Sequence, residues 1–255
     1  MKPETSSGGL DGAVVLVTGG AQGIGRGVCE SFHAAGATVV VADLDIDRAA
    51  GTAAGAARMS AVRLDLRDPA SVTAAFEQAA ERHGGIDVLV NCAGLYPNTP
   101  LLDLPVAEWD EVYLVNVRGV MLASQAFARL PGRGERRIVN ISSAAARSAR
   151  VGAAHYCSSK AAVEMLTKVL ALELAPLGIT VNAVAPGLIE VAATASLAAD
   201  YVATLVAGQP VRRMGTPAEI ARACLFLADP QASFVTGSVL DVDGGFLAGT
   251  ALPPS

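Results

Sequence analysis

The chain of 255 residues is long enough for one α/β domain, which at this size buries roughly 70–75% of the surface exposed by its unfolded chain. Hydrophobic residues make up 52% of the sequence and charged residues 17%, a composition that excludes intrinsic disorder. The net charge of −5 argues against a nucleic-acid partner, because such a partner needs a basic protein face.

Neither a membrane anchor nor a metal site is indicated by the sequence. Residues 1–9 are polar and lack the apolar core of a secretion signal, so we expect a flexible segment over residues 1–10 and a cytoplasmic protein. The best apolar stretch, residues 191–208, is interrupted by Asp200 and consists mostly of alanine, so we expect no membrane span. The four cysteines lie far apart and the three histidines form no ligand motif, so no metal is expected.

Short β-branched runs alternate along the chain with longer alanine-rich segments of helical period. The runs are continuously apolar, which is typical of parallel strands covered on both faces. From residue 11 onward this alternation predicts one α/β domain, with an open, doubly wound, mostly parallel seven-stranded sheet flanked by helices. The expected strands are Ala13–Val17, Thr38–Ala42, Ala61–Asp65, Asp87–Val90, Arg137–Ile141, Thr180–Val184 and Val239–Val242. The expected helices lie near residues 23–35, 45–58, 69–83, 107–129, 155–175 and 217–228.

The first expected strand runs into a glycine-rich turn, T-G-G-A-Q-G-I-G, at residues 18–25. Gly19, Gly23 and Gly25 allow a tight turn and let the backbone approach a pyrophosphate closely. The helix that follows presents unpaired N–H groups and a positive dipole end to an anion. A glycine-rich turn also occurs for packing reasons alone, so this pattern needs support from the rest of the chain.

That support comes from the second expected strand, which is followed by Asp43. Asp43 stands 18 residues after Gly25, near the spacing of about 20 residues for a ribose-binding acid. Its carboxylate can accept hydrogen bonds from both ribose hydroxyls and would repel a 2′-phosphate. Gln22 and Leu44 stand where a basic residue would be needed to hold that phosphate. We therefore predict NAD over NADP, although Asp43 could instead be a solvated loop acid or a helix N-cap.

A second group of residues suggests acid–base chemistry. Tyr156 and Lys160 share one face at the start of an expected helix. A phenol titrates near pH 10, and a cation nearby can lower such a pKa by about 1–3 units. Taken alone, Y-x-x-x-K is a common exposed helical pair. However, Ser143 follows the fifth strand, and Asn116 occupies a helical position that suits it poorly unless its amide is used.

These motifs are joined by N-C-A-G at residues 91–94 and by Pro186-Gly187. In their order and spacing, the sequence over residues 11–247 resembles the short-chain dehydrogenase/reductase family. The resemblance implies a Rossmann-type fold and hydride transfer between NAD(H) and a small secondary alcohol or ketone. It makes Tyr156 the general acid/base, and Lys160 the group that lowers its pKa and binds the nicotinamide ribose. Ser143 would orient the substrate oxygen, and Asn116 would hold a water that relays the proton. The implied cofactor contacts are Gly19, Gln22, Gly23, Ile24, Gly25, Asp43, Asp65, Leu66, Asn91, Ala93, Gly94, Tyr156, Lys160, Pro186, Gly187 and Ile189.

The substrate is expected to meet residues 95–100, 144–151 and 188–211, of which the last resembles the family's lid. Their apolar character favours a moderately hydrophobic secondary alcohol or ketone. Val191 replaces the threonine of the family's P-G-x-x-x-T pattern, and Thr194 is the nearest substitute for its hydroxyl. Arg147 and Arg150 could meet a substrate carboxylate or phosphate, but solvent-facing loop arginines are the simpler interpretation.

Three alternatives remain open from the sequence. One is an NADPH-using reductase of carrier-bound 3-oxoacyl groups, in which Arg129, Arg133, Arg136 and Arg137 would dock an acidic carrier unless they form a solvated turn. The others are a non-catalytic NAD-binding redox sensor and a methyltransferase. The expected helices near 107–129 and 155–175 resemble those through which the family associates, which predicts a homotetramer.

Overall fold

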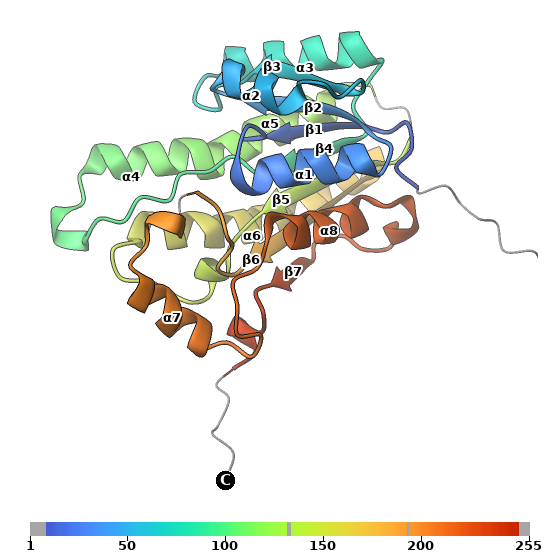
Figure 1. Ribbon diagram of the computed structural model, residues 1–255. Helices are drawn as coiled ribbons and strands as arrows, with labels where there is room; N and C mark the ends of the chain where they lie inside the picture. Colours follow the sequence, from blue (N-terminus) through green and yellow to red (C-terminus); the bar gives the residue numbers. More distant parts are fainter. Residues whose placement is uncertain (1–8, 132–133, 193, 250–255) are drawn as a thin grey trace, which may run out of the picture.

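The computed structural model describes residues 9–131, 134–192 and 194–249, and Figure 1 shows their arrangement. Seven parallel strands form one sheet in the order β3-β2-β1-β4-β5-β6-β7. The order reverses between β1 and β4, as in a doubly wound fold. The predicted fold class is therefore confirmed. The strands are β1 (Val14–Thr18), β2 (Thr38–Asp43), β3 (Met59–Arg63), β4 (Val88–Asn91), β5 (Arg136–Ile141), β6 (Ile179–Pro186) and β7 (Val239–Val242).

Helices cover both faces of this sheet. One face packs on α1, α2 and α8, and the other on α3, α5 and α6. In the order of the chain, the helices are α1 (Gly23–Ala34), α2 (Ile46–Ala53), α3 (Pro69–His83), α4 (Val106–Tyr113), α5 (Gly119–Arg129), α6 (Ala154–Leu174), α7 (Ala199–Ala207) and α8 (Pro217–Ala228).

The central strands are apolar throughout because their side chains alternate between two separate cores. Val15 and Val17 of β1 join the core that contains Phe32 of α1. Leu16 joins the opposite core, which contains Phe76 of α3. These five side chains have 1% or less of their surface exposed, and burial of each such group stabilises the fold by about 1.5–3 kcal/mol.

The register of the strands aligns their carboxyl ends at one edge of the sheet. Thr18 at the end of β1 pairs with Asn91 at the end of β4, and Asn91 pairs with Asn140 of β5. The loops that follow β1, β4 and β5 therefore meet at the same place, as ligand sites of such sheets require.

Several boundaries differ from the sequence-based expectations. β3 begins and ends two residues earlier than expected, because Met59 pairs with Val39 of β2. α2 stops at Ala53, shortly before Gly55 adopts a left-handed φ of 77°. The single helix expected over 107–129 is interrupted by a π-helical segment, Leu114–Arg118. The lid segment contains α7, which was not expected.

The ends of the chain bear on two further expectations. Residues 1–8 of the expected flexible segment lie outside the described residues, whereas Leu10 packs into the core with 6% of its surface exposed. Among the helices of the described part of the chain, none has the length and apolar character needed to cross a membrane.

Candidate active site

A cleft of about 520 Å³ opens at the carboxyl edge of the sheet, over the loops that follow the first six strands. It brings together Ser143, which follows β5, and Tyr156 and Lys160 of α6 with nearly all of the predicted cofactor contacts. The predicted contacts that line it are Gly19, Gln22, Gly23, Ile24, Gly25, Asp43, Asp65, Leu66, Ala93, Gly94, Tyr156, Lys160, Pro186, Gly187 and Ile189.

The turn between β1 and α1 has the geometry of an anion site. Gly19 adopts a φ of 67°, and a Cβ there would lie 2.6 Å from Cα of Ala93. Only glycine therefore lets this turn pack on the loop after β4. The N-cap of α1, Gln22, makes no side-chain capping hydrogen bond. The first N–H groups of the twelve-residue helix are thus free of a side-chain cap, as a pyrophosphate would need.

Asp43 closes the nucleotide end of the cleft. Its carboxylate accepts hydrogen bonds from the backbone N–H of Ala21 at 3.0 Å and of Asp45 at 3.1 Å. The N-cap of α2 is Asp45, which accepts from the N–H of Arg48 at 3.1 Å. The helix-cap interpretation of Asp43 is therefore wrong, and its carboxylate retains lone pairs for a ribose.

The nucleotide end also contains a cation that the sequence analysis missed. The guanidinium of Arg48 donates to the side-chain oxygen of Gln22 at 3.0 Å and pairs with Asp45 at 3.2 Å. Its position one helical turn after Asp45 was the available signal. Farther along the cleft, Arg67 pairs with Asp65 at 2.8 Å and with Glu111 at 3.0 Å. The hydrogen bond from Arg67 holds the pKa of Asp65 below its usual range.

Lys160 is held beneath the centre of the cleft. It is 5% exposed, and its Nζ donates to the carbonyl of Ile141 at 2.7 Å. The ammonium lies 6.0 Å from the centroid of the Tyr156 ring. A Cβ on Gly94 would approach it to 3.6 Å, so the glycine keeps the space above Lys160 open. Burial lowers the pKa of Lys160 to about 8.

The surroundings of Tyr156 correct one expectation. Burial raises the pKa of its phenol above the ordinary value, while hydrogen bonding by Ser143 and the positive charge of Arg150 act in the opposite direction. The expected lowering of this pKa by Lys160 is therefore not the net effect of the protein groups, because burial outweighs the nearby charges.

Two of the predicted site residues do not line the cleft. Asn91 points below it, and its side-chain N–H donates to Asn140 at 2.9 Å. The side-chain oxygen of Asn116 accepts from the N–H of Leu95, and its side-chain N–H group donates to the Leu95 carbonyl, both at 2.8 Å. A further hydrogen bond runs to Ser159 at 3.1 Å. Asn116 thus uses its amide, as expected, but to hold the loop after β4.

The loop after β6 accommodates Val191 without the usual hydroxyl. Val191 packs beside Gly23: a Cβ placed on this glycine would lie 3.6 Å from Cγ1 of Val191, an ordinary van der Waals distance. Thr194 also lines the cleft, but its hydroxyl donates to the carbonyl of Ile189 at 2.8 Å and accepts from the N–H of Val191. The hydroxyl of Thr194 therefore stabilises the loop itself.

The arginines expected to be solvent-facing have different roles. Arg147 pairs with Asp241 and, at 3.3 Å, with Glu164. Arg150 lines the cleft with its guanidinium carbon 5.6 Å from the centroid of the Tyr156 ring. Arg136 and Arg137 are buried in β5, 5% and 3% exposed, so they form neither a solvated turn nor a docking patch. Of the other two, Arg133 lies outside the described residues.

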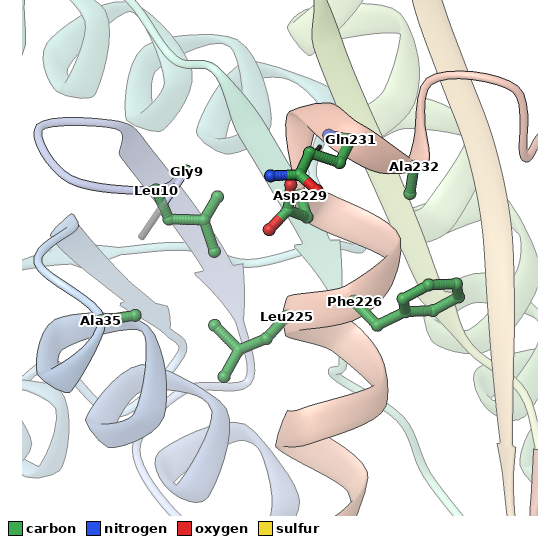
Figure 2. A pocket seen from close by; sticks show the side chains of 8 residues that line it. All are labelled: Gly9, Leu10, Ala35, Leu225, Phe226, Asp229, Gln231 and Ala232. Atoms are coloured by element: carbon green, nitrogen blue, oxygen red, sulfur yellow. Dashed lines mark hydrogen bonds between the residues drawn. The ribbon is translucent and has the colours of Figure 1, made fainter. Parts of the chain in front are cut away.

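A second cavity of about 480 Å³ lies near the other end of β1, between α1 and α8 (Figure 2). Its walls are mainly apolar. Asp229 is its only titratable lining residue, and its carboxylate accepts from the N–H of Gln231 at 2.7 Å as a turn cap. This cavity therefore provides no acid–base pair, and the chemistry of the described residues belongs to the larger cleft.

A Rossmann-type sheet with a glycine-rich turn, an aspartate at the end of β2 and a Ser–Tyr–Lys group in one cleft is the arrangement of a nicotinamide-dependent oxidoreductase. The chain belongs to the short-chain dehydrogenase/reductase family. Residues 19–247 match the family described as "Enoyl-(Acyl carrier protein) reductase".

Relatives of differing specificity support this assignment. The 3-oxoacyl-[acyl-carrier-protein] reductase of Aquifex aeolicus is 38% identical over 242 residues, covering 92% of this chain and 98% of the relative. The cis-4-hydroxycyclohexanecarboxylate dehydrogenase of Sinomonas cyclohexanicum is 40% identical over 242 residues, covering 92% and 96%. The crystal structure of a short-chain dehydrogenase/reductase from Mycobacterium marinum superposes with a TM-score of 0.89 at 37% identity, covering 94% and 97%. The methyltransferase interpretation is therefore wrong.

Proposed function

We propose that the protein is an NAD-dependent dehydrogenase that interconverts a small secondary alcohol and its ketone. The observation that carries this proposal is the convergence of Ser143, Tyr156 and Lys160 on one wall of the cleft. A hydroxyl donor, a phenol and a buried cation are the groups that proton transfer at a carbinol oxygen requires.

Each group has a distinct part in the proposed reaction. During alcohol oxidation, the phenolate of Tyr156 accepts the proton of the carbinol O–H. Ser143 accepts a hydrogen bond from the N–H of Ala145 at 3.1 Å, and its own O–H, which hydrogen-bonds to the Tyr156 phenol, would donate to the reacting oxygen of a bound substrate. Lys160 contributes positive charge beneath the phenol and would hold the nicotinamide ribose. When bound, NAD would supply the hydride acceptor and, as the oxidised ring, a further positive charge that favours the phenolate.

The preference for NAD rests on Asp43. Its carboxylate stands at the end of β2, held by two backbone N–H groups, where it can accept the ribose hydroxyls and repel a 2′-phosphate. Asn116 has a positioning part in this proposal, since it fixes the loop that carries Ala93 and Gly94. A water relay through Asn116, a homotetramer and a cytoplasmic location stay predictions from the sequence.

The strongest alternative is an NADPH-dependent reductase of carrier-bound 3-oxoacyl groups, since the Aquifex aeolicus relative is a 3-oxoacyl-[acyl-carrier-protein] reductase. Asp43 opposes the extra phosphate of NADPH. Burial of Arg136 and Arg137 removes half of the basic cluster that would dock an acidic carrier. We therefore favour the free alcohol or ketone as substrate.

A Tyr156→Phe variant tests the proposed function, including the alternative of a non-catalytic sensor. Oxidation of a panel of secondary alcohols would be followed through the absorbance of NADH, with Tyr113→Phe as the matched control. We expect Tyr156→Phe to lower kcat by at least about 100-fold, the lower range for loss of a general base. NAD binding, measured by calorimetry, should persist. Turnover that survives in a folded Tyr156→Phe protein would contradict the mechanism, and NAD binding without turnover of any alcohol would favour the sensor.

A further inference from the structure

One charged side chain at the substrate end of the cleft is left without an acidic partner. Arg150 follows β5 in the loop that leads to α6, and its guanidinium carbon lies 5.6 Å from the centroid of the Tyr156 ring. Its Nε is buried and donates no hydrogen bond. Among the described residues, no carboxylate forms an ion pair with this guanidinium.

The other charged groups that line the cleft are already engaged. Arg67 is paired with Asp65 and Glu111, and Asp43 accepts two backbone N–H groups. Lys160 donates to a backbone carbonyl. Arg150 is therefore the cation in the described cleft that neither pairs with an acid nor has a part in the cofactor contacts proposed above.

The contact with Tyr156 does not by itself satisfy Arg150. A cation–π interaction uses the face of a guanidinium and not its N–H donors. Its five N–H donors point outward in the guanidinium plane and need acceptors when water is excluded. A half-buried arginine with an unpartnered Nε is therefore arranged for an anion beside the reacting phenol.

We propose that Arg150 binds a carboxylate of the substrate, so that the protein acts on hydroxy acids and the corresponding oxo acids. This inference rests on the proposed function for the identity of the reacting carbinol. One guanidinium matches one carboxylate through two parallel hydrogen bonds. A phosphate dianion would keep a second charge for which the described wall offers no further free cation.

The neighbouring side chains limit the distance between the two groups of the substrate. Leu95, Tyr96 and Leu188 line the same cleft, and the Tyr96 ring meets that of Tyr156 edge-on with 6.3 Å between centroids. These apolar groups suit the few carbons that would connect the carboxylate to the carbinol. Since Arg150 stands against the Tyr156 ring itself, we expect that connection to be short.

The first test compares kcat/KM for 3-hydroxybutanoate and 4-hydroxypentanoate with kcat/KM for their methyl esters, using NAD as cofactor. The unmodified protein should prefer the acids. Arg150→Met should lower the acid-to-ester ratio about 10- to 100-fold, because a hydrogen-bonded charge contributes about 1.5–3 kcal/mol. Arg150→Lys should restore part of the ratio. Arg147→Met, which removes a nearby arginine already paired with Asp241, should leave the ratio unchanged.

The second test measures binding without turnover. Butanoate, butanamide and butyl phosphate would each be titrated by calorimetry into the protein saturated with NAD. We expect butanoate to bind more tightly than butanamide and to lose at least tenfold in affinity in Arg150→Met. Tighter binding of butyl phosphate than of butanoate would overturn the assignment to carboxylates.

The two tests separate this inference from the proposed function. If esters and other neutral alcohols are oxidised as well as the acids, and butanoate does not bind, the role of Arg150 is overturned while the proposed function stands. If no alcohol is oxidised but butanoate binding depends on Arg150, the proposed function fails and the carboxylate site remains.

Discussion

At the level of single residues, Lys160 illustrates a conflict between stability and function. Burial lowers its pKa from the ordinary 10.5 to about 8. Between these two pH values the unfolded chain binds more protons than the folded one, so the stability contributed by this group rises with pH. Below about pH 8 the buried ammonium destabilises the fold, and this cost disappears as the pH approaches 10.5.

We therefore expect Lys160→Met to be more stable than the unmodified protein at pH 7, by about 1–2 kcal/mol once the lost hydrogen bond to Ile141 is included. A stability difference of this size raises Tm by about 2–4 °C per kcal/mol. The gain in stability should shrink as the pH rises from 8 to 10.5. The kcat of Lys160→Met should be at least about 100-fold lower than that of the unmodified protein. Thermal unfolding from pH 6.5 to 10.5 measures the gain in stability, and a constant difference in Tm would contradict the linkage.

Asp43 and Arg48 together determine the second residue-scale prediction, which concerns cofactor choice. Removing the carboxylate in Asp43→Ala leaves Arg48, which donates to Gln22 at 3.0 Å, as a cation near the ribose. We expect the ratio of kcat/KM for NADP to that for NAD to rise about 10- to 100-fold, because close like charges cost roughly 1–3 kcal/mol.

Two variants make this cofactor test specific. In the double variant Asp43→Ala/Arg48→Met, the ratio of kcat/KM for NADP to that for NAD should fall most of the way back to the value of the unmodified protein, since this variant lacks the cation as well as the acid. Asp47→Ala makes the same change of charge at an exposed position in the first turn of α2 and should leave the ratio near its original value. An equal rise in Asp47→Ala would mean that long-range charge, not Asp43, sets the preference.

At the level of elements, the π-helical segment between α4 and α5 places Asn116 fully inside the protein. Segments of this kind often occur at functional sites. Asn116→Ala would leave the N–H and carbonyl of Leu95 without their partner, so we expect a loss of about 1–3 kcal/mol in stability. It should also lower kcat/KM more than Ser159→Ala does. Ser159 accepts a hydrogen bond from the Asn116 amide, whereas Asn116 itself holds the Leu95 backbone. Equal kinetic losses in the two variants would show that Asn116 has no positioning role.

The elements also show which features a sequence can and cannot specify. Continuous apolar runs predicted the central strands, because a strand that is buried on both faces has apolar side chains at every position and not only at every second one. The ends of β3 were misplaced because Ser60 and Arg63 interrupt the apolar residues between Met59 and Leu64, and only pairing with β2 selects the register. The π-helical segment was missed because the helical period runs on through residues 107–129.

The site follows the same rule. Ser143, Tyr156 and Lys160 were predicted because each stands at a fixed distance from a strand end or a helix start. Asn91 belongs to a recognisable motif, but a motif gives position along the chain and not side-chain direction, and its strand turns it below the cleft. Arg150 was assigned to solvent because no periodicity fixes the orientation of a side chain in a loop.

At the level of the whole molecule, α6 presents an apolar stripe to the outside. Met165, Val169 and Leu172 recur at helical spacing and are 59%, 41% and 79% exposed. On a helix whose opposite side fills the core, such a stripe marks a contact surface. It lies on one of the helices through which the sequence predicted association.

We therefore expect Val169→Glu/Leu172→Glu to lower the molar mass measured by light scattering below that of the unmodified protein, which we predict to be a tetramer. Two carboxylates in the stripe would be desolvated at any interface formed there, at a cost that dissociation relieves. Leu177→Glu, 54% exposed just beyond α6, is the matched control and should keep the tetrameric mass. A monomeric mass for the unmodified protein would refute the predicted tetramer. A double variant that keeps the tetrameric mass would show that the stripe on α6 does not form the interface.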